Sequence, residues 1–479
     1  MTVEGQSMLK RLTAVLLVLI LVLSCAGIGE AASYKRLKKG SRGAAVKTLQ
    51  TELKNQGYYS GKIDGIYGNG TVKAVKAFQR KNGLKADGIA GPRTQEKLYA
   101  KAGETGTEEP AAAQPEAVQP AEIPSATDQT QAIAFLNTIQ KNTGAACGTL
   151  VLSRNGKTFL TWSFGDVDEN TCFRIASVTK WVTAIGLMTL YDQGKLDLDK
   201  DISSYLGFNV RNPAYPDTPV TARMLLTHTS SLSPDASDYH PDWNRIGKKG
   251  YDPVFDESVK PGTIYAYADY NGALFGCLIE AISKQSVQNY LNQKVFRPLG
   301  LTAGYSPNFL PSDAVCKDLL KANGKVEISV QKDRTRAYNN KADPKGNNGY
   351  TVGKLYINAV SMTRLAQMMY NGGQLDGVRI LKESTVRLME SDQVMLADSP
   401  YGLSTERLNQ FDRGTWYGHQ GRYSGLSSNI YYQRETGITM ALIMNGYDYQ
   451  LEDNIVTPAV SILRNMEKIE EICLGTPET

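Results

Sequence analysis

The sequence is poor in the residues that most often bind metals or build disulfide frameworks. Its 479 residues include three histidines and six cysteines, and the cysteines show neither a CxxC pair nor a zinc-ligand spacing. A Gly-x-Ser-x-Gly segment is also absent. We therefore expect that the protein binds no metal and no cofactor, and that it is not a hydrolase of the Ser-His-Asp type. Disulfide pairing stays open, and a Cys147–Cys172 bond across neighbouring strands is one possibility.

Long apolar runs are scarce as well. The one such run, residues 12–23, follows two basic residues and is too short for a comfortable transmembrane helix, which needs about 20 residues. It suits a secretory leader, so residues 1–32 are predicted to be a secretion signal. Two endings remain open. A lipoprotein-like box would place a lipid on Cys25 and tether the protein to a membrane, whereas simple cleavage is favoured because Leu23 is large for that box.

Charge of one sign is concentrated in a short stretch. The formal net charge is +5, but residues 35–99 hold 15 Lys/Arg and 4 Asp/Glu. That stretch alone has a net charge of +11, so the rest of the chain has −6. A small basic module on a mildly acidic body suggests an anionic partner for the module, although a solubilising basic face would look the same.

Residues 34–101 are predicted to form a small all-α domain. Apolar residues recur at helical spacing over 44–55 and again over 71–81, and glycines bound each run. An internal repeat is present, because the Asp-Gly-Ile-x-Gly segment that begins at Asp64 recurs at Asp87, each time with a threonine soon after. Such aspartates are expected to cap loop amides.

The same stretch resembles a known domain type. The segments "LQTELKNQGYY", "GKIDGIYGNGTVKAVKAFQRKNGL" and "DGIAGPRTQEKL" resemble three-helix peptidoglycan-binding domains over nearly all of 35–99. The resemblance implies that peptidoglycan is the partner of residues 34–101, which explains the basic charge better than nucleic acid does. Residues 102–128, rich in Ala, Pro and Glu, are predicted to be a flexible linker.

Residues 129–473 show a mixed α and β pattern. Two hairpins are predicted near the two ends of this region, and a largely helical stretch separates them. The predicted strands are 147–152 and 158–164, then 427–433 and 438–445; helices are predicted over 133–140 and 455–470, and long loops around 207–262 and 302–350. We expect an α+β fold, in which one antiparallel sheet combines both ends and a helical subdomain is inserted.

Ser-x-x-Lys occurs three times, beginning at Ser7, Ser177 and Ser329. Only Ser177 opens a convincing helix, which has an apolar stripe and ends at Gly194. Residues three apart share a helix face, so Lys180 can reach the Ser177 hydroxyl. A buried lysine with a lowered pKa would then take the serine proton.

Further motifs follow in order. The segments "FRIASVTK", "LLTHTSSL", "YAYADYNGALFGCLIE" and "GHQGRYSGLSS" are similar to those of class C-like serine hydrolases in the serine β-lactamase and penicillin-binding-protein superfamily, over about 145–470. The resemblance implies a β-lactamase-like fold with Ser177 as nucleophile. Lys180 and Tyr267 would share the proton transfers, and His419 would offer an uncharged hydrogen-bond donor to substrate.

The resemblance also assigns substrate contacts. The amides of Ser177 and Arg422 would form an oxyanion hole beside Gly421, and the Arg422 side chain would meet a substrate carboxylate or remain on the surface. Asp269 stands where the family usually has asparagine, and a carboxylate only accepts hydrogen bonds. It is expected to pair with Lys180, which weakens the case for β-lactam hydrolysis. His228 is expected to be structural.

These expectations combine into an exported, cell-wall-associated serine hydrolase of a Gram-positive type envelope. It would act through an acyl-enzyme, with D-alanyl-D-alanine stem peptides as the leading substrate. D-alanyl esters on teichoic acid and β-lactams are alternative substrates. A non-catalytic wall-binding or β-lactam-sensing protein is the alternative of another class.

Overall fold

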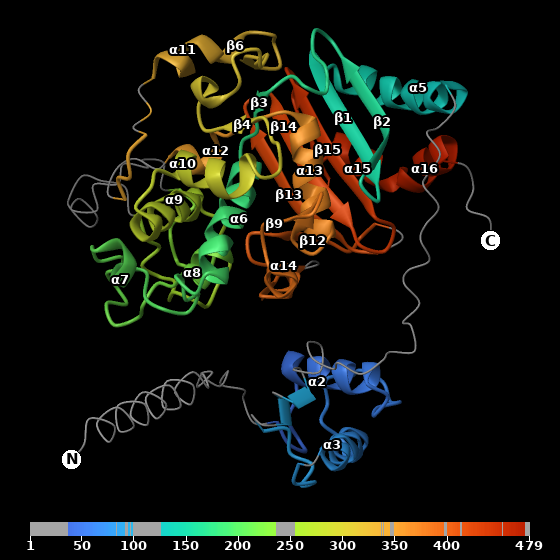
Figure 1. Cartoon of the computed structure of the whole chain (residues 1–479), viewed down its shortest axis with the longest axis vertical. Coiled ribbons are helices and arrows are strands. Elements are labelled where there is room, and N and C mark those ends of the chain that lie inside the picture. The colour runs from blue at the N-terminus through green and yellow to red at the C-terminus, as the bar shows by residue number, and fades with distance from the viewer. Residues whose placement is uncertain are drawn as a thin grey trace, which may run out of the picture. The chain divides into compact units, whose positions relative to one another are not determined.

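The computed structural model describes residues 37–98, 126–235 and 254–474, apart from short gaps. The gaps are residues 83, 92–93, 96, 337, 339, 345–348, 397–399, 412–413 and 453. The chain divides into two compact units, residues 1–117 and 118–479 (Figure 1). The predicted secretion signal and Cys25 lie outside the described residues, as does all but the last part of the predicted linker.

The N-terminal unit contains the helices α2 (Ala44–Asn55) and α3 (Asn69–Lys81). Both were predicted, and α3 begins two residues earlier than expected, directly after Gly68. Their apolar faces form one small buried core: Leu37, Val46, Leu49, Leu53, Tyr67, Ala74, Val75, Phe78, Ala90 and Leu98. A core of this size gives limited stability, so polar contacts matter more here than in a large domain.

The sequence repeat is also a repeat of hydrogen bonds. Buried Gln50 and Gln79 each donate from Nε2 to the aspartate, a carbonyl and the threonine of one repeat. The acceptors are Asp64, Ile66 and Thr71 at 2.9–3.1 Å, and Asp87, Ile89 and Thr94 at 3.0–3.2 Å. Each aspartate also accepts from the amide two residues on, so the predicted loop-capping role is confirmed.

The C-terminal unit contains an eight-stranded antiparallel sheet in the order β10-β11-β12-β13-β14-β15-β1-β2. Its strands are β1 (Cys147–Arg154), β2 (Lys157–Phe164), β10 (Val394–Met395), β11 (Pro400–Tyr401), β12 (Glu406–Leu408), β13 (Trp416–Tyr423), β14 (Leu426–Gln433) and β15 (Ile438–Asn445). Because β15 pairs directly with β1, the two ends of the domain share one sheet, as predicted.

Helices cover both faces of this sheet (Figure 1). The helices of the unit are α5 (Ala126–Thr143), α6 (Val178–Asp192), α7 (Ser203–Leu206), α8 (Ala222–Leu226), α9 (Asp269–Ser283), α10 (Val287–Leu291), α11 (Val330–Thr335), α12 (Tyr350–Gly353), α13 (Ala359–Tyr370), α14 (Glu383–Glu390), α15 (Thr457–Arg464) and α16 (Met466–Leu474). A π-helical turn, Asn292–Phe296, follows α10, and a 3-10 turn spans Pro307–Phe309.

Each face has its own core. One face of the sheet packs against α5, α15 and α16, and the other packs against α6 and α13. Helix α9 packs on α6. Most of the region between β2 and β10 therefore forms the predicted helical subdomain. Short strands supplement it: β3 (Phe173–Arg174), β4 (Ala303–Gly304), β5 (Leu319–Leu320), β6 (Val326–Ile328), β7 (Tyr356–Ile357), β8 (Gln374–Leu375) and β9 (Val378–Arg379).

Three details of the predicted elements were wrong. The closing helix over 455–470 is two helices, because the short strand β17 (Ile455–Val456, paired with β16, Leu451–Glu452) precedes α15, and Asn465 breaks the helical run before α16. The short helix predicted over 133–140 is longer. The stretch 302–350 holds several short elements instead of one loop, since pairing with distant segments stabilises pieces too short to show a periodicity of their own.

Candidate active site

Ser177 lies at a constrained junction between β3 and α6. Ala176, just before it, has φ of 46°, a left-handed conformation that costs energy for a residue with a Cβ. The junction is held from both sides, because β3 pairs with β7 and the Ile175 amide donates to the Leu355 carbonyl at 3.0 Å. Ser177 forms the N-cap of α6 and is half-exposed. The hydroxyl is thus presented at a helix N-terminus, where negative charge is favoured.

Helix α6 ends at Asp192, two residues before Gly194, close to the predicted end. It differs from the prediction in its surroundings, since every residue from Val178 to Leu190 is buried. The predicted apolar stripe is therefore one part of a helix enclosed on all sides. Lys180 has no exposed surface as a result.

Three groups surround the Lys180 ammonium. Its Nζ lies 3.0 Å from Ser177 Oγ, 2.8 Å from the Val352 carbonyl and 2.7 Å from Asp269 Oδ1. It also lies 5.3 Å from the centroid of the Tyr267 ring. The predicted Ser177–Lys180 contact and the predicted Lys180–Asp269 pair are both present.

The expectation of a lowered lysine pKa was wrong. Burial by itself lowers the pKa of Lys180, but the opposing influence of Tyr267 and Asp269 is larger and raises it above its ordinary value. In the resting site Lys180 is therefore an ammonium that donates to Ser177. The sequence indicated a buried lysine paired with Asp269, but it did not show that its neighbours would outweigh burial and keep the lysine charged.

Tyr267 lies just before α9, and the segment "LLTHTSSL" holds it in place. His228 stacks on the Tyr267 ring with centroids 4.2 Å apart, and its Nδ1 accepts from the Ala268 amide at 3.2 Å and from the Asn271 amide group. Asn271 in turn accepts from Ser230 at 2.6 Å. These bonds match the predicted structural role of His228.

The Tyr267 hydroxyl is buried within reach of Ser177 and Lys180, but it makes no hydrogen bond of good geometry among the described residues. Burial raises the pKa of Tyr267, and the nearby Lys180 ammonium opposes that rise. The tyrosine is therefore neutral in the resting site. A neutral phenol beside the Ser177–Lys180 pair can donate a proton to an incoming group.

Asp269 begins α9, where the helix dipole favours a carboxylate. Its side chain is 36% exposed, whereas its partner Lys180 is fully buried. One side of the carboxylate therefore meets the lysine, and solvent or substrate can reach the rest. This is the position at which the family pattern has an amide.

His419 and Gly421 lie on β13, at a stretch with one unpaired edge. β14 pairs with β13 along its whole length, whereas β12 pairs only with residues 416–418. Within the described residues, the stretch 419–423 thus leaves its second edge open. Backbone groups on such an edge can bind an extended substrate in the manner of an added strand.

The hydrogen bonding of His419 differs from the prediction. Its Nδ1 lies 2.6 Å from the Gln420 carbonyl, an acceptor, so Nδ1 carries the proton. Burial lowers the pKa of His419, which keeps the ring neutral. Its buried Nε2 has no partner among the described residues and is consequently an acceptor, where a donor had been expected.

Gly421 passes directly against the nucleophile. A Cβ at this position would meet the Ile175 carbonyl at 2.4 Å and the Ser177 amide at 2.9 Å. Only a residue without a side chain lets β13 approach so closely. Arg422, the next residue, is exposed. Its role and the two-amide oxyanion hole stay predictions.

Sequence reasoning missed the segment from Tyr350 to Leu355. The Val352 carbonyl accepts from Lys180, and the Thr351 hydroxyl donates to the Gly272 carbonyl at 2.7 Å. Gly272 itself lies against the lysine, because a Cβ there would be 2.8 Å from Lys180 Cγ. The missed segment falls at the border of a predicted loop and carries no charged or nucleophilic motif, so only its position reveals its role.

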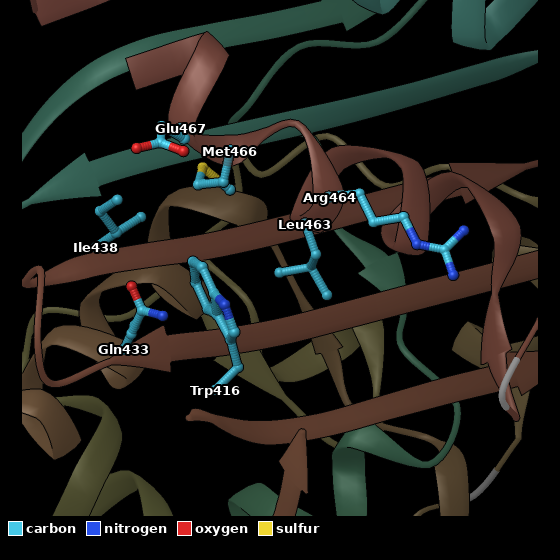
Figure 2. Close-up of a pocket in the computed structure, with 7 residues that line it drawn as sticks. All are labelled: Trp416, Gln433, Ile438, Leu463, Arg464, Met466 and Glu467. Carbon is cyan, nitrogen blue, oxygen red and sulfur yellow. The ribbon is translucent and has the colours of Figure 1, made fainter. Parts of the chain in front are cut away.

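One small cavity, of about 20 Å³, lies elsewhere in this unit (Figure 2). Trp416, Ile438, Leu463 and Met466 are among the side chains around it. Trp416 and His419 are three residues apart on β13, so their side chains point to opposite faces of the sheet. The cavity is therefore separate from the Ser177 site.

A sheet with helices on both faces and a serine at a helix N-terminus beside a buried lysine define a serine hydrolase. The chain belongs to the beta-lactamase family, because the model of that family matches residues 132–460, more than half of the chain. A second model, described as a putative peptidoglycan binding domain, matches residues 42–98. The protein is thus a serine hydrolase of the β-lactamase and penicillin-binding-protein type with an N-terminal peptidoglycan-binding domain.

Individual relatives match different parts of the chain. Penicillin-binding protein 4 of Amycolatopsis lactamdurans is 27% identical over 292 residues, which is 58% of this chain and 74% of that protein. A spore cortex-lytic enzyme of Bacillus cereus is 45% identical over 69 residues, 14% of this chain and 27% of its own length. The structure of a class C beta-lactamase mutant aligns with a TM-score of 0.56 and 14% identity, and the alignment covers 72% of this chain and 99% of that one.

Within the described residues, no group of three or more His, Cys, Asp or Glu side chains could hold a metal ion. Among the same residues, no helix combines the length and the apolar character that crossing a membrane requires.

Proposed function

We propose that the protein is a cell-wall D-alanyl-D-alanine carboxypeptidase-like peptidase, with Ser177 as its nucleophile. The 3.0 Å contact between Ser177 Oγ and Lys180 Nζ, with the buried Tyr267 hydroxyl beside both groups, carries this proposal. The peptidoglycan-binding domain supports an extracellular, wall-associated location, where stem peptides are the abundant D-alanyl substrate. Secretion by way of residues 1–32, with Cys25 removed or lipidated, is part of the same proposal.

The proposed reaction proceeds through an acyl-enzyme. Ser177 Oγ attacks the carbonyl carbon of the scissile amide, and its proton passes to neutral Lys180. Tyr267 donates a proton to the departing D-alanine nitrogen and recovers one from Lys180. The amides of Ser177 and Arg422 stabilise the oxyanion, a contribution of about 10²–10³ in rate per donor. Water then attacks the acyl-enzyme by the reverse sequence of proton transfers.

The resting charges set a condition on this mechanism. Lys180 is protonated, so it must lose one proton before it can accept the proton of Ser177. His419 Nε2, an acceptor that faces the same site as Tyr267, can receive a hydrogen bond from a substrate N–H. The open edge of β13 can bind the extended backbone of a peptide substrate.

Asp269 favours a second candidate function, hydrolysis of D-alanyl esters on teichoic acid. A D-alanyl ester carries a free ammonium next to the scissile carbonyl, whereas the acyl part of a stem peptide or a β-lactam carries an amide there. The exposed part of the Asp269 carboxylate can pair with an ammonium and cannot donate to an amide carbonyl. On this point the ester fits the site better than the peptide does.

The test uses the full chain and its Ser177→Ala variant. Each is incubated with a fluorescent penicillin, a D-Ala-D-Ala stem peptide and a D-alanyl ester of glycerol phosphate. Labelling or D-alanine release that disappears in the variant would support Ser177, and the faster of the two natural substrates identifies the function. Stable labelling without turnover of any substrate would instead support a β-lactam sensor. No reaction with any of the three would contradict the enzyme proposal.

A further inference from the structure

Two cysteines far apart in the sequence lie opposite each other next to β3, the short strand that leads to Ser177. Cys172 directly precedes β3, and a parallel bridge pairs it with Cys316. The bridge has both of its hydrogen bonds, from the Cys172 amide to the Val315 carbonyl at 2.8 Å and from the Lys317 amide to the Cys172 carbonyl at 3.0 Å. The two residues are therefore fixed in register.

The register brings the two side chains together. Neighbouring strands are spaced by about 4.8 Å, and disulfides span Cα separations of about 4.4–6.8 Å. Directly opposed residues of a parallel bridge also point their side chains to the same face. Cys172 and Cys316 both pack in one small apolar cluster with Leu310 and Tyr356. No backbone movement is required for the two sulfur atoms to meet.

The two thiols differ in exposure and in acidity. These differences suit Cys316 to attack an external disulfide and Cys172 to attack the mixed disulfide that results. Cys172 is fully buried, whereas Cys316 is partly exposed. Contact with the Cys316 thiol, together with burial, raises the pKa of Cys172. Contact with the Cys172 thiol, helped by the Arg334 charge, lowers the pKa of Cys316. An external oxidant can thus reach the more acidic sulfur first.

We propose that Cys172 and Cys316 are a modification site, at which a low-molecular-weight or protein disulfide oxidises the pair to a reversible intramolecular disulfide. The Cys147–Cys172 pair considered from the sequence is not the partner arrangement, because Cys147 lies on β1 and contacts Asn445. This proposal rests on the bridge geometry and is independent of the substrate.

The electrons and protons balance through two exchange steps. The Cys316 thiolate attacks one sulfur of the oxidant disulfide, forms a mixed disulfide and releases one thiolate. The Cys172 thiol then loses its proton and attacks the Cys316 sulfur, which releases the second thiolate of the oxidant. Two protein thiols are oxidised, one external disulfide is reduced, and the two protons end on the two released thiols.

The bond would join segment 310–335, which carries α11 and β6 at the margin of the unit (Figure 1), to the strand that leads to Ser177. Asp333 of that segment already contacts the same region, since it accepts from Tyr356 at 2.8 Å and lies 3.6 Å from Arg174. A covalent link between positions so distant in sequence restricts the unfolded chain strongly. We expect a higher melting temperature in the oxidised protein.

The experiment compares the full chain after equilibration in oxidised glutathione and in reduced dithiothreitol. Samples are quenched in acid, unfolded, alkylated and mapped by peptide mass spectrometry, which also distinguishes any bond to Cys25. We expect a Cys172–Cys316 linked peptide, two fewer alkylated thiols and a melting temperature higher by on the order of 5 °C. Dithiothreitol should reverse all three changes.

Two variants serve as controls. Cys316→Ser should lose the linked peptide and the oxidant-dependent shift, yet melt with the wild type under reducing conditions, because Cys316 is partly exposed. Cys147→Ala removes a buried thiol that has no thiol partner in the described residues, and it should retain the shift. The proposal is overturned if both thiols stay alkylatable after oxidation, or if the bond that forms joins other cysteines.

Discussion

At the scale of single residues, the site is distinguished by where its protons rest. Lys180, Asp269 and Tyr267 form a group in which one ammonium is matched by one carboxylate, and the phenol is neutral. The Asp269 carboxylate stabilises the charged form of Lys180. Lys180 must therefore lose a proton before it can act as the base for Ser177. We therefore expect the identity of one residue, aspartate in place of asparagine, to affect both the pH dependence of the reaction and the choice of substrate.

The first prediction concerns Asp269→Asn. Without the carboxylate the pKa of Lys180 falls, so the alkaline rise of the acylation rate should move to lower pH. The new amide can donate to an acyl-amide carbonyl, so labelling by fluorescent penicillin should become faster. Hydrolysis of the D-alanyl ester should fall by about 10–100-fold, since a charge-assisted bond is lost. Stopped-flow labelling and D-alanine release across pH 6–10 measure both effects, and an unmoved pH profile would contradict the assigned pair.

A second prediction follows from the two buried histidines. Burial lowers the pKa of His228 and of His419, so the unfolded chain binds protons near pH 6.5 that the folded chain does not. The stability they contribute is present above pH 6.5 and is lost as the pH falls. The free energy of unfolding should decrease by up to about 1.4 kcal/mol per pH unit for each histidine. Urea unfolding between pH 7.5 and 5.5 gives the slope.

His228→Gln is the informative variant for that slope. Glutamine does not titrate in this range, so about half of the pH dependence should disappear even if the variant is less stable overall. The window lies above the titration of the carboxylates, several of which have lowered pKa values, such as Asp201 at about 2. A slope identical to that of the wild type would show that His228 does not remain neutral in the folded state.

At the scale of elements, the site depends on how closely α6 approaches α9 and β13. Glycines stand at both approaches: Gly272 faces Lys180, and Gly421 faces the Ser177 amide. A third glycine, Gly186 on α6, faces the Leu291 side chain, where a Cβ would come within 2.8 Å. The same kind of close packing therefore occurs inside and outside the site, which allows a matched comparison.

The third prediction compares Gly272→Ala with Gly186→Ala. Each adds one methyl group against the end or stem of a flexible side chain, and each should destabilise the unit by roughly 1–3 kcal/mol. Only Gly272→Ala displaces the Lys180 ammonium, so only this variant should lose acylation rate, on the order of 100-fold. Thermal melts and penicillin labelling separate the two quantities. Equal loss of labelling in both variants would mean that stability alone governs the rate.

At the scale of the whole molecule, two compact units divide the work of attachment and chemistry. The N-terminal unit is small, and its two glutamine-centred networks add polar contacts to the repeat loops beside its apolar core. The C-terminal unit has two large cores and contains every residue proposed for the reaction. Loss of one unit should leave the other function intact.

The fourth prediction uses Gln50→Ala to unfold the N-terminal unit. Gln50 donates to Asp64, Thr71 and the Ile66 carbonyl, so its loss leaves buried groups unpaired at a cost of roughly 3 kcal/mol or more. Cosedimentation with purified peptidoglycan should be lost, while the rate of labelling by soluble penicillin is unchanged. Gln56→Ala, at the part-buried end of α2, removes two hydrogen bonds and should retain binding. A parallel loss of labelling would contradict the independence of the two units.

Much of the fold was predictable because local patterns and long-range packing agree in it. Helix α2 was predicted with its observed ends, and β15 likewise, since each has a clear apolar period between glycine or turn signals. The register of β1 with β15 follows from burying their apolar faces together. Strands of two residues, such as β3 and β7, were not predictable, because each exists only through its partner.

The sequence by itself determined which residues could do chemistry: a Ser-x-x-Lys pair at a helix start, a tyrosine and aspartate two residues apart, and a histidine and glycine two residues apart. Spacing along one element follows from backbone geometry, and so it can be read without a structure. Only the tertiary structure decided the protonation state of Lys180, the acceptor role of His419 Nε2, the part played by Val352, and the pairing of Cys172 with Cys316. Each of these depends on a charge, a carbonyl or a thiol that a different element supplies, and the free energy of such contacts exists only once the chain has folded.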